Sequence, residues 1–77
     1  MDRVFEALAS TARRKILAFL NEGELTAGEI ASRFDFSKPA LSGHLRILED
    51  AGLIVREKRG QFVYFQLVPD RLANTVF

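Results

Sequence analysis

The chain has no cysteine, one histidine and two prolines among its 77 residues. Without cysteine it can form neither a disulfide nor a thiolate metal site, and a single histidine provides no set of metal ligands. The sequence is therefore compatible with a reducing compartment. We expect no metal and no other cofactor.

Long apolar segments and catalytic motifs are also absent. No run approaches the roughly 20 apolar residues of a membrane span, and the first residues lack a signal-peptide pattern, so we expect a cytoplasmic protein with no membrane partner. The chain has no glycine-rich phosphate loop, no cysteine nucleophile and no serine–histidine–carboxylate pattern. We do not expect an enzyme.

The net charge is only +1, so total charge does not indicate a partner; its distribution is more informative. Residues 37–46 read Ser-Lys-Pro-Ala-Leu-Ser-Gly-His-Leu-Arg and contain no acidic side chain. A second group of basic residues surrounds Gly60. An acid-free helical segment with a basic turn nearby is typical of a surface that meets phosphates.

Apolar spacing and capping residues predict four helices before residue 52. The first contains Val4, Phe5 and Leu8. The second begins at Ser10 or Thr11 and stops at Gly23. The third opens with a capping box, Thr26 and Glu29, and has Ile30 and Phe34 facing inward. Ser37 caps the fourth, which tolerates Pro39 in its first turn and ends at Gly52.

The hydrophobic period then changes from helix to strand. Residues 53–55 and 62–67 predict two strands joined by a turn at Arg59–Gly60, with Val63, Phe65 and Leu67 facing the core. Pro69 can begin a last helix. The expected fold is mainly α with a β-hairpin, a winged helix-turn-helix in the order α-α-α-α-β-β-α, forming one domain over residues 1–77.

Projecting the fourth helix at 100° per residue separates two faces. Leu41, Leu45 and Leu48 form a buried back, which Ala40, Ile47 and Ala51 extend. The opposite face has Lys38, Ser42, Arg46 and Glu49, flanked by Pro39 and Gly43. Small side chains allow close approach to base edges, and the cations reach guanine or phosphate. A solvated helix face carries the same residue types, so the pattern alone leaves both interpretations open.

His44 falls between Leu48 and Ala51 by angle, on the apolar side. It is a candidate DNA contact, but a packing role is favoured. Arg13, Arg14 and Lys15 fan over about 200° of their helix, so we expect structural ion pairs from them rather than one contact face.

The segment from Arg56 to Gln61 is the candidate wing. Lys58, Arg59 and Gln61 at a projecting tip suit a neighbouring phosphate backbone or a minor groove. Protection of an edge strand by charge is the alternative. The candidate DNA-binding residues are thus Ser37, Lys38, Pro39, Ser42, Gly43, His44, Arg46, Lys58, Arg59 and Gln61.

Several spaced motifs resemble the ArsR family of bacterial repressors. These motifs are residues 12–17, 37–48 and 51–54 and the strand that ends with Phe65-Gln66-Leu67. Within them, Ser42-Gly43-His44-Leu45 matches the family's Ser-x-His-Leu signature, and Phe65 stands where a tyrosine is usual. The resemblance implies a homodimeric repressor on a palindromic operator in double-stranded DNA. It also implies that Lys38, Pro39, Ser42 and Gly43 face the major groove.

Two departures from the family are informative. The metal-sensing segment Cys-Val-Cys-Asp-Leu of many members is replaced by residues 26–30, Thr-Ala-Gly-Glu-Ile, and Asp70 has no histidine beside it. The resemblance is thus to a branch that does not sense metal, similar to the SdpR-type autorepressors. The chain also ends early in the expected last helix. The small domain has surplus apolar residues, which we hypothesise form a dimer interface: Val4, Phe5, Leu8, Leu72, Val76 and Phe77. The alternative is that these residues close the core of the monomer.

Two functional alternatives remain open from the sequence. A winged helix can serve as a protein-interaction module without DNA, and a small-ligand-sensing switch would require a pocket that the sequence does not reveal. The operator, the regulated genes and the inducing signal are not encoded in any recognisable pattern.

Overall fold

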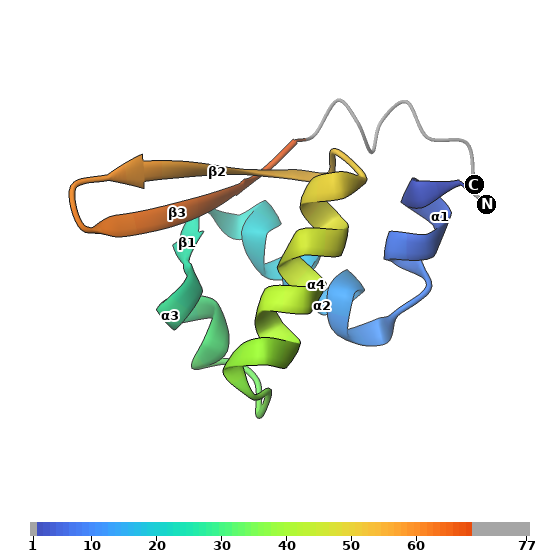
Figure 1. Cartoon of the computed structure of the whole chain (residues 1–77), viewed down its shortest axis with the longest axis horizontal. Helices are drawn as coiled ribbons and strands as arrows, with labels where there is room; N and C mark the ends of the chain where they lie inside the picture. Colours follow the sequence, from blue (N-terminus) through green and yellow to red (C-terminus); the bar gives the residue numbers. More distant parts are fainter. Residues whose placement is uncertain (1, 69–77) are drawn as a thin grey trace.

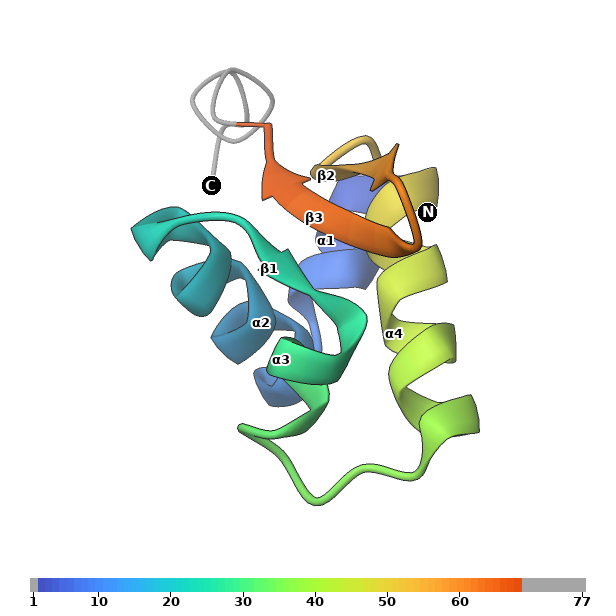
Figure 2. The same ribbon diagram turned by 90° about the vertical axis from the view of Figure 1, so that its left-hand side faces the viewer.

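The computed structural model describes residues 2–68. Figure 1 shows α4 in the middle of the molecule, with α1 on one side of it and α3 on the other. In the view of Figure 2, α4 lies on the right, opposite α2 and α3. A β-hairpin extends away from the helices. In chain order the elements are α1 (Arg3–Leu8), α2 (Thr11–Glu22), β1 (Leu25–Thr26), α3 (Ala27–Ala31), α4 (Lys38–Asp50), β2 (Ile54–Arg59) and β3 (Phe62–Leu67).

Side-chain caps fix where the helices begin. The Ser10 hydroxyl accepts from the N–H of Arg13, and Thr26 and Glu29 exchange both bonds of a capping box, as predicted. The Ser37 hydroxyl accepts from the N–H of Ala40 at 3.2 Å and so satisfies one of the free donors at the start of α4. Asp2 caps α1 in the same way, a cap that is not among the predicted ones.

Gly52 ends α4 as predicted. Its φ of 76° lies in the left-handed region that favours glycine. The Gly52 N–H donates to the Glu49 carbonyl at 2.9 Å, and the Leu53 N–H donates to the Leu48 carbonyl at 3.0 Å. These two bonds form a Schellman motif, which turns the chain directly from α4 into β2.

The hairpin is confirmed, but the sheet has three strands rather than two. Its order is β1-β3-β2, antiparallel throughout. The strand β1 was not predicted, because two residues are too short for a recognisable pattern and the partner of Leu25, Phe65, lies far along the chain. Gly60 and Gln61 form the turn, with a positive φ at Gly60 alone, the pattern of a type II′ turn.

The core lies between the helices and one face of the sheet. Phe65 is buried, and Val63 and Leu67 pack against the core, as the alternation predicted. The predicted leucines of α4 are also buried, and the core is completed by Val4, Ala7, Ile16, Leu17, Leu20, Ile30, Ala51, Leu53 and Ile54.

Two details differ from expectation. Ala40 is exposed rather than buried, since it lies in the first turn of α4. Phe34 follows the end of α3 instead of lying within it, and its ring stacks on Phe36 at 4.6 Å and meets the edge of Phe19 at 5.6 Å. This aromatic group packs the turn between α3 and α4 against α2.

The predicted last helix, starting at Pro69, lies outside the described residues. Among the helices described, none has the length and apolar character to cross a membrane. The architecture is mainly helical with a small antiparallel sheet, and α3, the turn and α4 form a helix-turn-helix beside the winged hairpin.

Replacing Ser37 with alanine should destabilise the protein by about 1 kcal/mol, because the Ala40 N–H loses its acceptor at the start of α4. Chemical denaturation should show a lower midpoint with an unchanged slope. Ser37→Asp restores the acceptor and should regain most of the loss. If both variants match the wild type, the cap does not stabilise α4.

Candidate DNA-binding surface

The front face of α4, defined as Lys38, Ser42, Gly43 and Arg46, is exposed along its length. The opposite stripe of α4 is buried, so the two faces lie as the helical projection predicted. Within residues 2–68, the side chains of the three non-glycine residues make no hydrogen bond or ion pair. Their donors remain available to a partner.

The fold itself does not require a glycine at position 43. A Cβ placed on it would meet no atom within 4 Å, so packing does not require a glycine. In mid-helix, glycine is destabilising by roughly 0.5–1 kcal/mol relative to alanine. A partner that must approach the backbone closely would explain the residue.

His44 is half-buried between α2 and the turn before α4. Its Nδ1 lies 3.3 Å from Nη1 of Arg13, and its ring centre lies 5.1 Å from that of Phe36. Because a guanidinium can only donate, Nδ1 accepts and the ring proton lies on Nε2. Burial, and secondly the positive charge of Arg13, lowers the pKa of His44. These contacts favour the packing interpretation.

Arg13 connects α4 to the first two helices. Its Nε donates to the Ala7 carbonyl at 2.9 Å and its Nη2 to the Glu6 carbonyl at 3.0 Å. Arg14 similarly donates to the Leu8 carbonyl. Carbonyls at a helix C-terminus lack helical partners and carry partial negative charge. Arg13 and Arg14 are therefore bound within the fold, but mainly by main-chain carbonyls rather than by the carboxylates that we expected. Lys15 is exposed and makes no hydrogen bond or ion pair within residues 2–68.

Near its C-terminal end, α4 is joined to the hairpin by an ion pair. Arg56 Nε donates to Glu49 Oε2 at 2.9 Å, and the guanidinium lies 5.1 Å from the centre of the Phe65 ring. The Glu49 hydrogen bond raises the pKa of Arg56. Glu49, which the sequence placed on the same face as Lys38, is thus occupied by the hairpin.

Within the wing, the two cations nearest the turn, Lys58 and Arg59, point to opposite faces of the ribbon. Lys58 pairs across the strands with Val63 on the core side, whereas Arg59 pairs with exposed Phe62 on the outer side. Within residues 2–68 the Lys58 side chain has no hydrogen-bond or ion-pair partner, while Arg59 is bound by two carboxylates. Gln61 is exposed in the turn.

The candidate dimer residues divide into three groups. Val4 is 5% exposed and belongs to the core of the single chain. For this residue the structure therefore agrees with the alternative interpretation, that it closes the monomer core. Phe5 is 48% exposed, and Leu8 packs partly against the core. Leu72, Val76 and Phe77 lie outside the described residues.

Comparison with known proteins agrees with this geometry. Residues 10–55 match the family described as "Bacterial regulatory protein, arsR family". The chain belongs to the ArsR family. It is therefore a DNA-binding transcriptional regulator, and the resemblance seen in the sequence is confirmed.

Two similar proteins span almost the whole chain. Transcriptional repressor SdpR of Bacillus subtilis (strain 168) is 48% identical over 76 residues, covering 99% of this chain and 84% of SdpR. A crystal structure described as a possible transcriptional regulator for arsenical resistance has a TM-score of 0.85 and 40% identity, covering 95% of this chain and 75% of the other.

A third similar structure is HlyU from Vibrio cholerae N16961, with a TM-score of 0.83 and 36% identity over 92% of this chain and 78% of HlyU. These neighbours establish the winged-helix architecture.

Neutral His44 should make stability depend on pH. Since its pKa is lower in the folded than in the unfolded chain, the stabilisation is present above the ordinary value near 6.5 and is lost as pH falls through the folded-state value. We expect denaturation midpoints to fall between about pH 7.5 and about pH 5.5.

His44→Asn provides the matched control, because an amide oxygen keeps an acceptor for Arg13 and does not titrate. The drop should be smaller in this variant. An identical drop in both proteins would show that His44 has no part in the pH dependence.

Proposed function

We propose that the chain is a cytoplasmic homodimeric repressor whose α4 enters the major groove of a palindromic operator. The observation that supports this most directly is the exposed front face of α4, which lies within the acid-free residues 37–46 and has cations unpaired within the described residues and a glycine that packing does not require. A solvated helix face needs charged residues, but it does not need a destabilising glycine at its centre.

Each residue of this surface has a distinct proposed role. Lys38 and Arg46 donate to guanine acceptors or phosphates, and Ser42 can bond a base edge. Gly43 permits close approach, Pro39 flanks the contact in the first turn, and Ser37 holds the cap. From the wing, Lys58 and Gln61 contact the adjacent backbone. We assign His44 to positioning α4 through Arg13 rather than to reading bases.

Dimerisation is proposed through the terminal helices. Phe5 is a large apolar side chain that the described part of the monomer leaves half exposed, and Leu8 lies on the same short helix. With Leu72, Val76 and Phe77 they would form a two-fold interface. A two-fold dimer places its two α4 helices in successive major grooves, about 10 base pairs apart.

Repression rather than activation is proposed from SdpR, which is named a transcriptional repressor, although HlyU of Vibrio cholerae is named an activator. The signal is proposed not to be a thiophilic metal, because the chain contains no cysteine. Thr26 and Glu29, in the segment that carries the metal-sensing motif in other members, instead form the capping box of α3.

Selection of bound duplexes from a random pool tests this proposal. We expect an enriched two-fold symmetric motif with half-sites about one helical turn apart. An asymmetric single half-site would contradict the dimer and leave sequence-specific binding intact. If no sequence is enriched and binding shows no salt dependence, the protein-interaction alternative is correct.

A further inference from the structure

The outer face of the sheet carries a cluster centred on Arg59, one of the candidate DNA-binding residues. Arg59 lies between Glu57, on its own strand, and Glu24, in the turn before β1. Arg59 Nε donates to Glu57 Oε1 at 2.7 Å, and Nη2 donates to Glu24 Oε1 at 3.1 Å. The guanidinium also lies 4.6 Å from the centre of the Tyr64 ring. One cation thus binds two carboxylates and an aromatic face.

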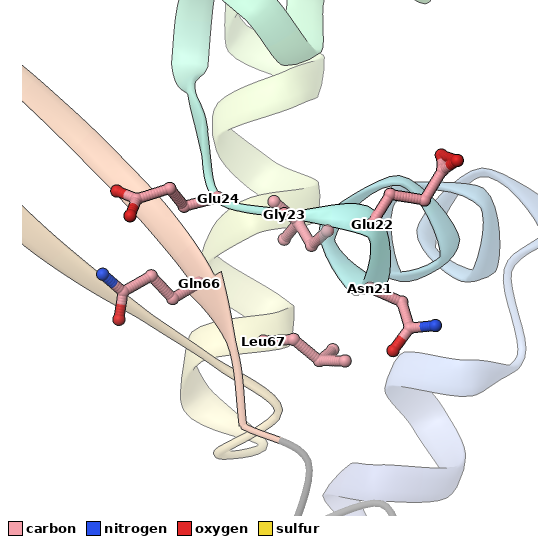
Figure 3. A pocket seen from close by; sticks show the side chains of 7 residues that line it. Asn21, Glu22, Gly23, Glu24, Gln66 and Leu67 are labelled. Atoms are coloured by element: carbon pink, nitrogen blue, oxygen red, sulfur yellow. The ribbon is translucent and has the colours of Figure 1, made fainter.

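This cluster connects two distant parts of the chain. Arg59 is the last residue of β2 before the turn, whereas Glu24 follows α2 and adjoins Gly23. Figure 3 shows the Glu24 and Gln66 side chains extending to one side of this region, while Glu22 points the other way. Gln66 Nε2 donates in turn to Glu57 Oε1 at 3.3 Å. The tip of the hairpin is thereby bound to the body of the molecule.

We propose that Arg59 and Glu24 are positioning residues, which hold the wing at the angle required for Lys58 to reach DNA, and that Arg59 is not itself a phosphate contact. This rests on the proposed function. Adjacent residues of a strand point to opposite faces, so Lys58 and Arg59 cannot both face one backbone. Moving Arg59 to a phosphate would also leave Glu24 and Glu57 together on the outer face without their shared cation.

The proposal predicts effects opposite to those of simple electrostatics. Removing an acidic charge ordinarily strengthens binding to DNA. Glu24→Gln should instead weaken binding to the selected operator about two- to fivefold, the range expected when an exposed ion pair is lost. Glu22→Gln removes the same charge from a side chain that points away, and should bind as tightly as the wild type or more tightly.

Arg59→Lys distinguishes positioning from contact. It keeps the charge but loses the planar fork that binds two carboxylates at once. A phosphate contact would tolerate this change, whereas a positioning residue should show a loss similar to that of Glu24→Gln. The double variant should then be no weaker than the weaker single variant, because both changes break one connection.

Affinities should be measured by fluorescence anisotropy over a salt series, with amide hydrogen exchange at Arg59 and Phe62, the strand pair that closes the turn, as the DNA-free readout. Lys58→Ala should flatten the salt slope by about one per protomer. Glu24→Gln and Arg59→Lys should flatten it by a smaller amount, because the displaced wing brings Lys58 to the phosphate less often, and both should accelerate exchange.

The inference is overturned if Glu24→Gln binds like Glu22→Gln, or if exchange at the turn is unaffected. A wild-type protein with no preference for any duplex would overturn the proposed function, and this inference with it. Tight operator binding by every variant would overturn the inference alone.

Discussion

The structure depends on the burial of one narrow leucine stripe. Leu41, Leu45 and Leu48 hold α4 against α1, α2 and β2, and this is the main apolar contact of a helix that leaves its other side to solvent. Burying a leucine contributes about 1.5–3 kcal/mol, far more than any surface ion pair of the protein. Packing does not restrict the residue types on the front face, so these residues can suit a partner instead.

Polar contacts then fix the orientation that the leucines leave adjustable. Ser37 sets the first residue of α4, the Schellman motif at Gly52 sets its end, and Arg13 bridges the end of α1 to His44. Apolar packing is not directional, whereas hydrogen bonds are. Reading bases would require α4 to be placed to within a fraction of an ångström, so the proposed role of its front face depends on these bonds.

The parts that could be predicted from sequence are those determined by neighbouring residues. Caps at Ser10, Thr26 and Ser37, the stop at Gly52 and the alternation along β3 are local patterns, and each is confirmed. The front face of α4 followed from helical period alone.

Features that depend on distant residues could not be predicted. The strand β1 exists because Leu25 meets Phe65, and Arg59 is bound because Glu24 lies beside it in space. The charge of an arginine also does not show which group in the fold it binds. We expected Arg13 to bind a carboxylate and Arg59 to contact DNA, yet the fold engages Arg13 with main-chain carbonyls and Arg59 with carboxylates. Among the wing cations, Lys58 alone is left without a partner within residues 2–68.

The central claim is that the front face of α4 is shaped for DNA rather than for the fold, and Gly43→Ala tests it most directly. The account predicts stability higher by about 0.5–1 kcal/mol, because alanine favours the helix and its Cβ meets nothing. It predicts operator affinity lower by about tenfold, the scale of one lost base contact. Gly28→Ala in α3 is the matched control, which should gain stability and keep its affinity. If Gly43→Ala is stabilised and binds the operator as tightly as the wild type, α4 does not approach DNA through this face and the account is wrong.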